Sequence, residues 1–311
     1  MVKPTIDAVD VDPKTGTTLG FYHFGEDRPN ILILSAAEGH SAGCVYTSYL
    51  MMKFLEELER IDGSVTILPV SNPLAFRLGA RVSPLDSQAL DSVFPGSEFG
   101  SVTERLAWEI WRRASQADFV IQLRSNPQSC LSNVVGLHRE YIHVRNLASQ
   151  LGLPFVIQGS GTRGALITEA AIDGIPAVSI ELRGYRDHVE AQAAVEVREA
   201  ILNFMRIKDM IPGEHIETSS VFTGRALNVN TEAEGFFIPG VTLGDSIPAE
   251  SSIGTVEGVG NVVSSFGGTV ISLSRMNYVF EGDKISTIAS PLIDQRGPIE
   301  EDEEQTRKRK W

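Results

Sequence analysis

The chain has 311 residues, of which 42% are hydrophobic, so it can bury one large core and a second small one. Its net charge of −13 argues against a nucleic-acid groove or an anionic membrane surface as a partner. The N-terminal residues lack a hydrophobic signal core and no apolar run approaches the ~18 residues of a membrane span, so we expect a cytoplasmic protein.

Between residues 28 and 210, apolar runs of strand length alternate with amphipathic runs of helix length. The strand-like runs cover 31–36, 64–72, 119–124, 154–158 and 177–182, and the helix-like runs cover 49–61, 104–115, 139–152, 166–174 and 189–207. This alternation is typical of an α/β fold with a parallel or mixed sheet and helices on both faces. Ligands of such folds bind at the carboxyl ends of the strands, where Glu38, Arg124 and Glu181 are expected.

The pattern changes near residue 212, where short β-branched runs separated by glycines replace the helical periodicity. The last residues are acidic and then basic, with almost no apolar content, which predicts a disordered tail. We therefore divide the chain into an α/β domain over 1–211 with an N-terminal extension over 1–27, an all-β domain over 212–293, and a charged tail over 294–311.

Residues 69–107 contain the most specific pattern of the chain. NPLAFRLGAR is followed by a Pro-Leu-Asp turn, then FPG, then GSVTERLA. These motifs resemble the succinylglutamate desuccinylase/aspartoacylase family, whose zinc carboxypeptidase-like enzymes hydrolyse N-acyl amino acids. The resemblance spans roughly 28–290. It implies a three-layer α/β/α domain with a mixed sheet and a small C-terminal β domain similar to a barrel-sandwich. It also implies that Asn72 and Arg81 face the cleft and bind the ligand.

The residues at the family's zinc-ligand positions have changed. The resemblance places those positions at Glu38 and Ser41, in ILILSAAEGHSAG, and at Arg124, in ADFVIQLRS. An arginine stays protonated and offers only hydrogen-bond donors, so it cannot ligate a metal. The family's substrate-gripping arginine is also replaced, by Ser92. We therefore expect no bound metal and no other cofactor, although the family itself uses zinc.

Glu181 lies at the position of the family's general base, in AAIDGIPAVSIELRG. The alternative is that a glutamate at the end of a buried strand simply pairs with a nearby arginine. Because a metal is what brings the pKa of bound water near ~7, a retained base does not by itself make a hydrolase. His40, two residues after Glu38, is expected to line the same pocket.

Other candidate motifs are weaker. Cys44 and Cys130 have neither a disulfide framework nor a metal-binding spacing. The run GSGTRG over 159–164 can be an anion seat of backbone amides or a tight turn, and it lacks the Lys-Ser/Thr of a P-loop. The predicted hairpin over 257–268 has no lysine, so a biotinyl- or lipoyl-type carrier role is not expected.

Two classes of function fit these observations. In the first, the chain is a pseudoenzyme that binds a small, carboxylate-bearing ligand, or pairs with an active paralogue or with copies of itself. Its ligand-binding residues are then Glu38, His40, Asn72, Arg81 and Arg124. In the second, it hydrolyses an amide bond of an N-acyl amino acid or a related small molecule through a rebuilt site of Glu38, His40 and Glu181, with or without a metal.

Glu38 and Arg124 are expected to form an ion pair where the zinc of the family lies. One ligand position has become an anion and another a cation, and positions that shared one metal converge in space. The rival interpretation is that Arg124 faces the open cleft and holds a substrate carboxylate in place of the arginine missing at Ser92.

Overall fold

The protein is described here by a computed structural model that covers all residues except 127, 184–187 and 293–311. The charged tail predicted for 294–311 lies outside the described residues. Within the described part, no helix is both long enough and apolar enough to cross a membrane.

The α/β fold expected from the sequence is confirmed, with a mixed sheet as its centre. Along the sheet the strands follow the order β1-β2-β4-β3-β5-β9-β7-β8-β10. Strands β4, β3, β5 and β9 run parallel to one another, whereas β7 is antiparallel to β9. The bounds of these strands are β1 (Thr5–Asp12), β2 (Thr17–Gly25), β3 (Asn30–Leu34), β4 (Ser64–Leu68), β5 (Phe119–Ser125), β7 (Asn133–Gly136), β8 (Phe155–Gln158), β9 (Ala177–Leu182) and β10 (Val221–Asn230).

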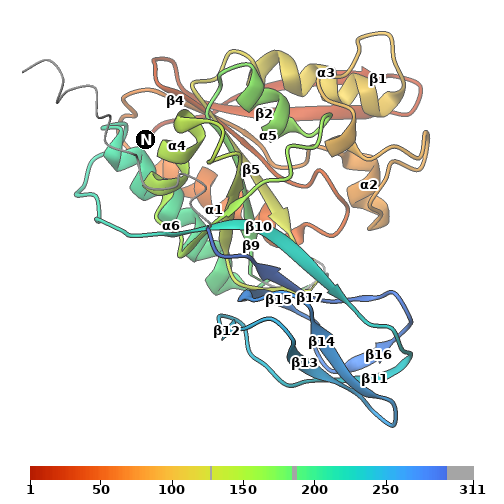
Figure 1. Ribbon diagram of the computed structural model, residues 1–311. Helices are drawn as coiled ribbons and strands as arrows, with labels where there is room; N and C mark the ends of the chain where they lie inside the picture. Colours follow the sequence, from red (N-terminus) through yellow and green to blue (C-terminus); the bar gives the residue numbers. More distant parts are fainter. Residues whose placement is uncertain (127, 184–187, 293–311) are drawn as a thin grey trace, which may run out of the picture.

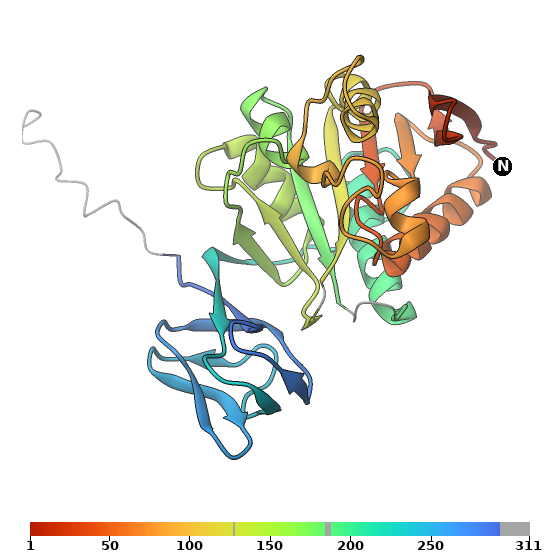
Figure 2. The same cartoon turned by 90° about the vertical axis from the view of Figure 1, so that its right-hand side faces the viewer.

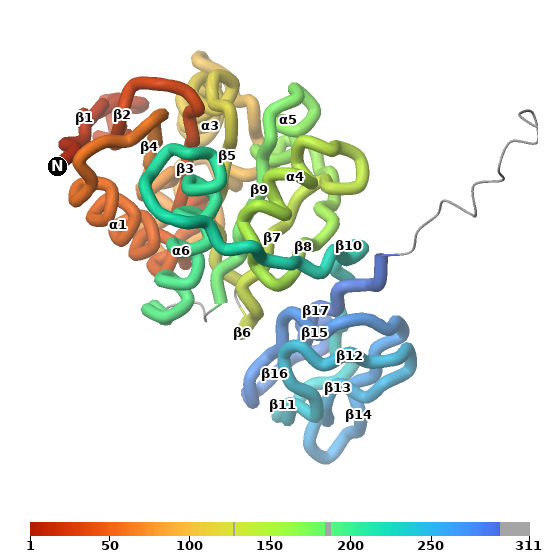
Figure 3. Tube along the Cα trace, turned by 90° about the vertical axis from the view of Figure 1, so that its left-hand side faces the viewer, coloured from red at the N-terminus to blue at the C-terminus, as the bar shows by residue number. Residues whose placement is uncertain are grey.

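Helices cover both faces of this sheet and give three layers (Figures 1 and 3). One hydrophobic core lies under α1, α4 and α6, and a second lies under α3 and α5 on the opposite face. The helices are α1 (Ala42–Glu57), α2 (Pro73–Leu78), the 3₁₀ turn η1 (Leu90–Ser92), α3 (Val102–Ala114), α4 (Ile142–Leu151), α5 (Leu166–Ile172) and α6 (Ala191–Ile207). The helix-like runs of the sequence therefore correspond to α1, α3, α4, α5 and α6.

The residues before the first predicted strand belong to the sheet. β1 and β2 form an antiparallel hairpin, and β2 pairs with β4, so the segment over 5–25 is the edge of the main sheet. Three residues of β2 are fully buried, Leu19 and Phe21 in the core under α3 and α5, and Phe24 in the core on the opposite face of the sheet. Residues 5–25 are thus structurally continuous with the rest of the α/β domain.

The C-terminal β region is joined to the main sheet through β10. The first half of β10 pairs in parallel with β8, and its second half pairs with β17 in the β region. Figure 2 shows the region beyond β10, in blue, lying against one end of the α/β layers. Its strands are β11 (Gly235–Pro239), β12 (Ser246–Ile247), β13 (Ser251–Val256), β14 (Gly260–Ser264), β15 (Gly268–Leu273), β16 (Asn277–Val279) and β17 (Lys284–Ala289).

The β region has its own core, which lies between a separate four-stranded sheet and the end of the main sheet. One sheet has the order β14-β13-β11-β16, and the other contains β17, β15 and β12. Phe237, Ile253, Ile285 and Ile288 are fully buried between them.

A loop of the α/β domain reaches into the β region and fixes its position. The short strand β6 (Ser129–Cys130), which follows β5, pairs with β15. Beside it, the buried Gln128 donates from Nε2 to Lys284 O (2.6 Å) and Ser274 Oγ (2.8 Å) and accepts at Oε1 from Ser272 Oγ (2.9 Å). The loop that follows the carboxyl end of β5 is therefore held by both β15 and β17.

Replacement of Gln128 by alanine is expected to lower the free energy of unfolding by about 2–3 kcal/mol, because three buried hydrogen-bonding groups lose their partner. Chemical denaturation of Gln128→Ala measures this loss, and Gln116→Ala, an exposed glutamine, is the matched control. If the two variants are equally stable, the loop does not hold the two parts of the chain together.

Candidate functional site

Neighbouring parallel strands bring the charged residues of the site to one edge of the sheet. β5 pairs on one side with β3 and on the other with β9, so their carboxyl ends lie together. In the register of β5 and β9, Arg124 stands directly opposite Glu181. Glu38 follows the end of β3 by four residues. The sequence analysis placed these three residues at strand ends, and the structure brings them together.

The backbone after β3 fixes the position of Glu38. Ala36 has a positive φ of 51°, which turns the chain sharply out of the strand. Gly39 N donates to Ala80 O at 2.7 Å, and an added Cβ at Gly39 would lie only 2.3 Å from Ala80 N. Only glycine allows this close approach between the two loops. The helix α1 then begins at Ala42, four residues after Glu38.

Arg124 occupies the centre of the site. Its Nη1 lies 2.8 Å from Asp91 Oδ2, and its Nη2 lies 3.5 Å from Glu38 Oε1. Burial by itself would lower the pKa of Arg124, but the carboxylates of Asp91, Glu181 and Glu38 outweigh it and raise that pKa. The expected ion pair between Glu38 and Arg124 is present, and Asp91 provides the shorter of the two contacts. The guanidinium is therefore engaged by carboxylates from two sides, which opposes the rival interpretation that it faces an open cleft.

Asp91 is the partner that sequence analysis missed. Its side chain is only 10% exposed, and its Oδ1 accepts a hydrogen bond from Leu166 N at 3.0 Å. It therefore joins the η1 turn, the start of α5 and the end of β5. The signal in the sequence was that Asp91 is the acidic residue of the Ala-Leu-Asp-Ser run that follows the NPLAFRLGAR motif.

The three positions that the resemblance assigns to zinc ligands line one small pocket. Glu38, Ser41 and Arg124 surround a cavity of about 10 Å³ together with Asp91 and the buried Gln122. A zinc site needs three or four Cys, His or carboxylate ligands. Here a carboxylate, a hydroxyl and a guanidinium take their places, and the described residues contain no other group of His, Cys, Asp and Glu placed to hold a metal. The residues present do not fit the zinc of the family.

The other predicted ligand-binding residues do not line this pocket, and only Arg81 contacts one of its residues. Arg81 Nε is 3.9 Å from Glu38 Oε1, so Glu38 stands between two guanidinium groups. Asn72 is fully buried as the N-cap of α2, where its Oδ1 accepts from Ala75 N at 3.2 Å. The His40 ring packs beside Gly79, and neither the small pocket nor the larger cavity described next is lined by it.

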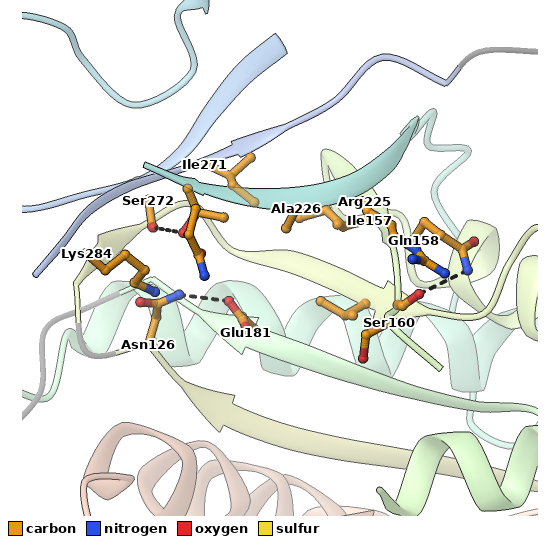
Figure 4. A pocket seen from close by; sticks show the side chains of 14 residues that line it. Asn126, Ile157, Gln158, Ser160, Glu181, Arg225, Ala226, Ile271, Ser272 and Lys284 are labelled. Carbon is orange, nitrogen blue, oxygen red and sulfur yellow. Dashed lines mark hydrogen bonds between the residues drawn. The ribbon is translucent and has the colours of Figure 1, made fainter. Parts of the chain in front are cut away.

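Glu181 lines a different and much larger cavity (Figure 4). Because β9 lies between β5 and β7, Glu181 separates the Arg124 pocket from a space of about 240 Å³ between β7, β8 and the β region. Its Oε2 accepts a hydrogen bond from Asn126 Nδ2 at 3.0 Å. Burial lowers the pKa of Lys284, which lines the same cavity, and the Glu181 carboxylate partly offsets this. Asn126 and Lys284 were not predicted from the sequence, although Lys284 is the only lysine between residues 209 and 307.

The weaker sequence candidates have structural explanations. Cys44 is fully buried, and burial raises the pKa of its thiol to about 12. Cys130 is also buried, with its Sγ donating to Leu182 O. In the GSGTRG run, Arg163 forms a two-point ion pair with Glu169 at 2.7 and 2.8 Å, and Gly164 N donates to the same carboxylate. Of the two interpretations of this run, the tight turn is the one that the structure supports.

Comparisons with known proteins agree with the fold and identify the family. Residues 27–208 match the model of the succinylglutamate desuccinylase/aspartoacylase catalytic domain. An N-alpha-acetyl-L-2,4-diaminobutyric acid deacetylase from Halomonas elongata is 28% identical over 165 residues, covering 50% of this chain and 48% of that protein. The matched part therefore spans about half the length of this curated relative.

Solved structures resemble the chain over nearly its whole length. A succinylglutamate desuccinylase/aspartoacylase from Rhodobacter sphaeroides has a TM-score of 0.79 at 16% identity, with 95% of each chain covered. The product-bound ectoine utilization protein EutE (DoeB) from Ruegeria pomeroyi also has a TM-score of 0.79, at 18% identity, with 93% of this chain and 98% of that chain covered. At these identities the likeness concerns the fold alone.

Replacing either partner of the Arg124–Asp91 ion pair is expected to destabilise the fold, and the two losses of stability should not be additive. Arg124→Met should lower the free energy of unfolding by about 1–2 kcal/mol, less than the ~3–5 kcal/mol of a fully buried pair, because the Arg124 side chain is 35% exposed. When Arg124→Met is combined with Asp91→Asn, the loss of unfolding free energy should be about 1 kcal/mol smaller than the sum of the two single losses.

The measurement is a double-mutant cycle by urea denaturation. The surface pair Arg28 and Asp118, in which the arginine is 72% exposed, is the matched control and should couple by less than about 0.5 kcal/mol. Additive effects of Arg124→Met and Asp91→Asn would mean that the guanidinium does not hold the site together.

Proposed function

Because the chain belongs to the succinylglutamate desuccinylase/aspartoacylase family, we propose that it is a member in which a guanidinium has taken the place of the zinc ion, and that it binds a small molecule without metal chemistry. The relatives named above are deacylating hydrolases. In this chain the family scaffold serves as a binding protein.

The observation that carries this proposal is the position of the Arg124 guanidinium between Asp91 and Glu38. The cationic end of this side chain lies where the resemblance places a metal, and it already neutralises the carboxylates there. A dication about 4 Å from a guanidinium would meet a repulsion of about 8 kcal/mol at an effective dielectric constant near 20. The positive charge of Arg124, which the carboxylates stabilise, therefore opposes the binding of a zinc ion at the same place.

The charge balance also explains how the pocket keeps its shape. Without a cation, the carboxylates of Glu38, Asp91 and Glu181 would repel one another at the edge of the sheet. Arg124 supplies a positive charge and the planar donors that carboxylates bind well. Glu181, whose Oε2 accepts a hydrogen bond from Asn126, is then available to bind a ligand from the larger cavity.

The alternative function is a hydrolase with a site rebuilt from Glu38, His40 and Glu181. Glu38 is engaged by Arg81 and Arg124, and among the described residues Glu38 and Glu181 line different spaces, while His40 lines neither of them. This arrangement favours the binding protein. Such a protein would affect a reaction by associating with an active paralogue or with further copies of the chain.

The purified protein is expected to contain substoichiometric zinc when elemental analysis is done without chelators. The matched control is a triple variant, Glu38→His with Ser41→Glu and Arg124→His, which restores the ligand types of the family. If the three positions converge as described, this variant should gain about one zinc per chain.

Hydrolysis is tested with N-alpha-acetyl-L-2,4-diaminobutyrate and N-succinylglutamate, the substrates that the relatives' names suggest. We expect no turnover by the natural chain, with or without added zinc. Stoichiometric zinc in the natural chain, together with hydrolysis that Glu181→Gln abolishes, would contradict the proposed function.

A further inference from the structure

We propose that two copies of the chain associate through the outer face of the four-stranded sheet β14-β13-β11-β16. This sheet covers one side of the core of the β region, and Figures 1 and 3 show it at the end of that region that lies away from the helices. The inference deepens the proposed function by naming the surface through which copies of the chain associate, and it rests on that function only for the role of the association.

Alternation along the strands separates an inner face of this sheet from an outer face. The inner positions, which include Phe237 and Val279, are buried in the core of the β region. The register places Phe236 opposite Tyr278, and residues that lie opposite one another share a face. The outer positions, all of them exposed, are Phe236, Ile238, Ser252, Thr255, Asn261, Val263 and Tyr278. The outer face therefore has no charged residue on its strands.

A row of aromatic rings crosses the β11 and β16 half of this face. The ring centroids of Phe236 and Tyr278 lie 5.4 Å apart with the planes at 87°, and those of Tyr278 and Phe280, which follows β16, lie 5.4 Å apart at 65°. These rings, Ile238 and Val263 are 39–59% exposed. Three of the five exposed aromatic side chains in the described part of the chain thus lie on or beside this sheet. Because the edge-to-face contacts already hold the rings in place, a partner that covers them loses little conformational entropy.

The exposed apolar area of this face has the size of an interface core. Three rings that are about half-exposed present about 300 Å², and with Ile238 and Val263 the apolar patch reaches roughly 400 Å². A stable interface buries about 800 Å² on each partner, with an apolar core and a polar rim. The patch supplies about half of this area. The uncharged polar residues beside it, which supply part of the rim, are Ser252, Thr255 and Asn261.

The charge of the chain favours a second copy as the partner. A net charge of −13 opposes anionic partners, and two copies repel each other least where the contact surface itself has no charge. A two-fold interface sets one patch against the same patch of the other copy, so the patch must be self-complementary. An uncharged apolar patch meets this condition. The edge strand β1 of the main sheet differs, because Asp7, Asp10 and Asp12 protect it against pairing with another strand.

The experiment is sedimentation equilibrium of the full natural chain at physiological salt, at concentrations from about 1 to about 100 μM. We expect a reversible dimer, with twice the mass of the chain, as the concentration rises. A natural chain that stays monomeric over this whole range would overturn the proposal.

Variants identify the surface. Phe236→Glu places a carboxylate from each copy in the apolar contact and should weaken the association by at least about 100-fold, because a two-fold interface contains each substitution twice. Phe99→Glu makes the same change at a phenylalanine that is exposed outside the patch, and this matched control should dimerise as the natural chain does. Thermal unfolding verifies that both variants are folded. A dimer that persists in folded Phe236→Glu would also overturn the proposal.

Another occupant of the same face gives a different result. Co-sedimentation of a monomeric natural chain with phosphatidylcholine vesicles, lost in Phe236→Glu, would overturn the proposal and assign the face to a lipid surface. Stoichiometric zinc or hydrolysis in the natural chain contradicts the metal-free function, whereas a monomeric chain contradicts only this interface.

Discussion

The structure of the site depends on one cation, the guanidinium of Arg124, placed among carboxylates at the edge of the sheet. Asp91 approaches it at 2.8 Å and Glu38 at 3.5 Å, and Glu181 stands opposite it on the next strand. These acids come from different loops and strands, and without a positive charge they would repel one another. The guanidinium provides that charge with fixed donors at the position where the sequence predicted the family's metal site.

Strand β9 lies between two separate spaces, the small pocket around Arg124 and the larger cavity beside the β region. On one side of Glu181 the side chain of Arg124 leaves a cavity of about 10 Å³, and on the other side a cavity of about 240 Å³ is open to a ligand. The larger space exists because the β region closes over β7 and β8, held there by β10 and by Gln128. The same loop carries Asn126, which orients Glu181. The contacts that dock the β region and the hydrogen bond that orients Glu181 therefore come from one short segment of chain.

Sequence reasoning identified most of the regular structure because helices and buried strands leave periodic patterns. The five long helices and the strands around 31–34, 64–68, 119–125, 155–158 and 177–182 follow the runs seen in the sequence. Short elements were missed. β7 has four residues and β6 has two, which is too few for a periodic pattern of apolar residues to appear. The hairpin over 5–25 alternates inward and outward residues and lies next to polar turns.

The sequence by itself determined the family and the layered α/β fold with its β region. The exchange of zinc-ligand residue types for Glu38, Ser41 and Arg124 stays a prediction from the resemblance. The sequence also indicated that an anion and a cation at converging positions would pair. Only the tertiary structure decided that Asp91 is the shorter partner of Arg124 and that Lys284 faces Glu181 across a cavity. These pairs join residues 33 and 103 positions apart, on loops and strands whose meeting depends on sheet order and domain docking. Local sequence patterns carry no information on such long-range contacts, because the docking of whole elements sets them.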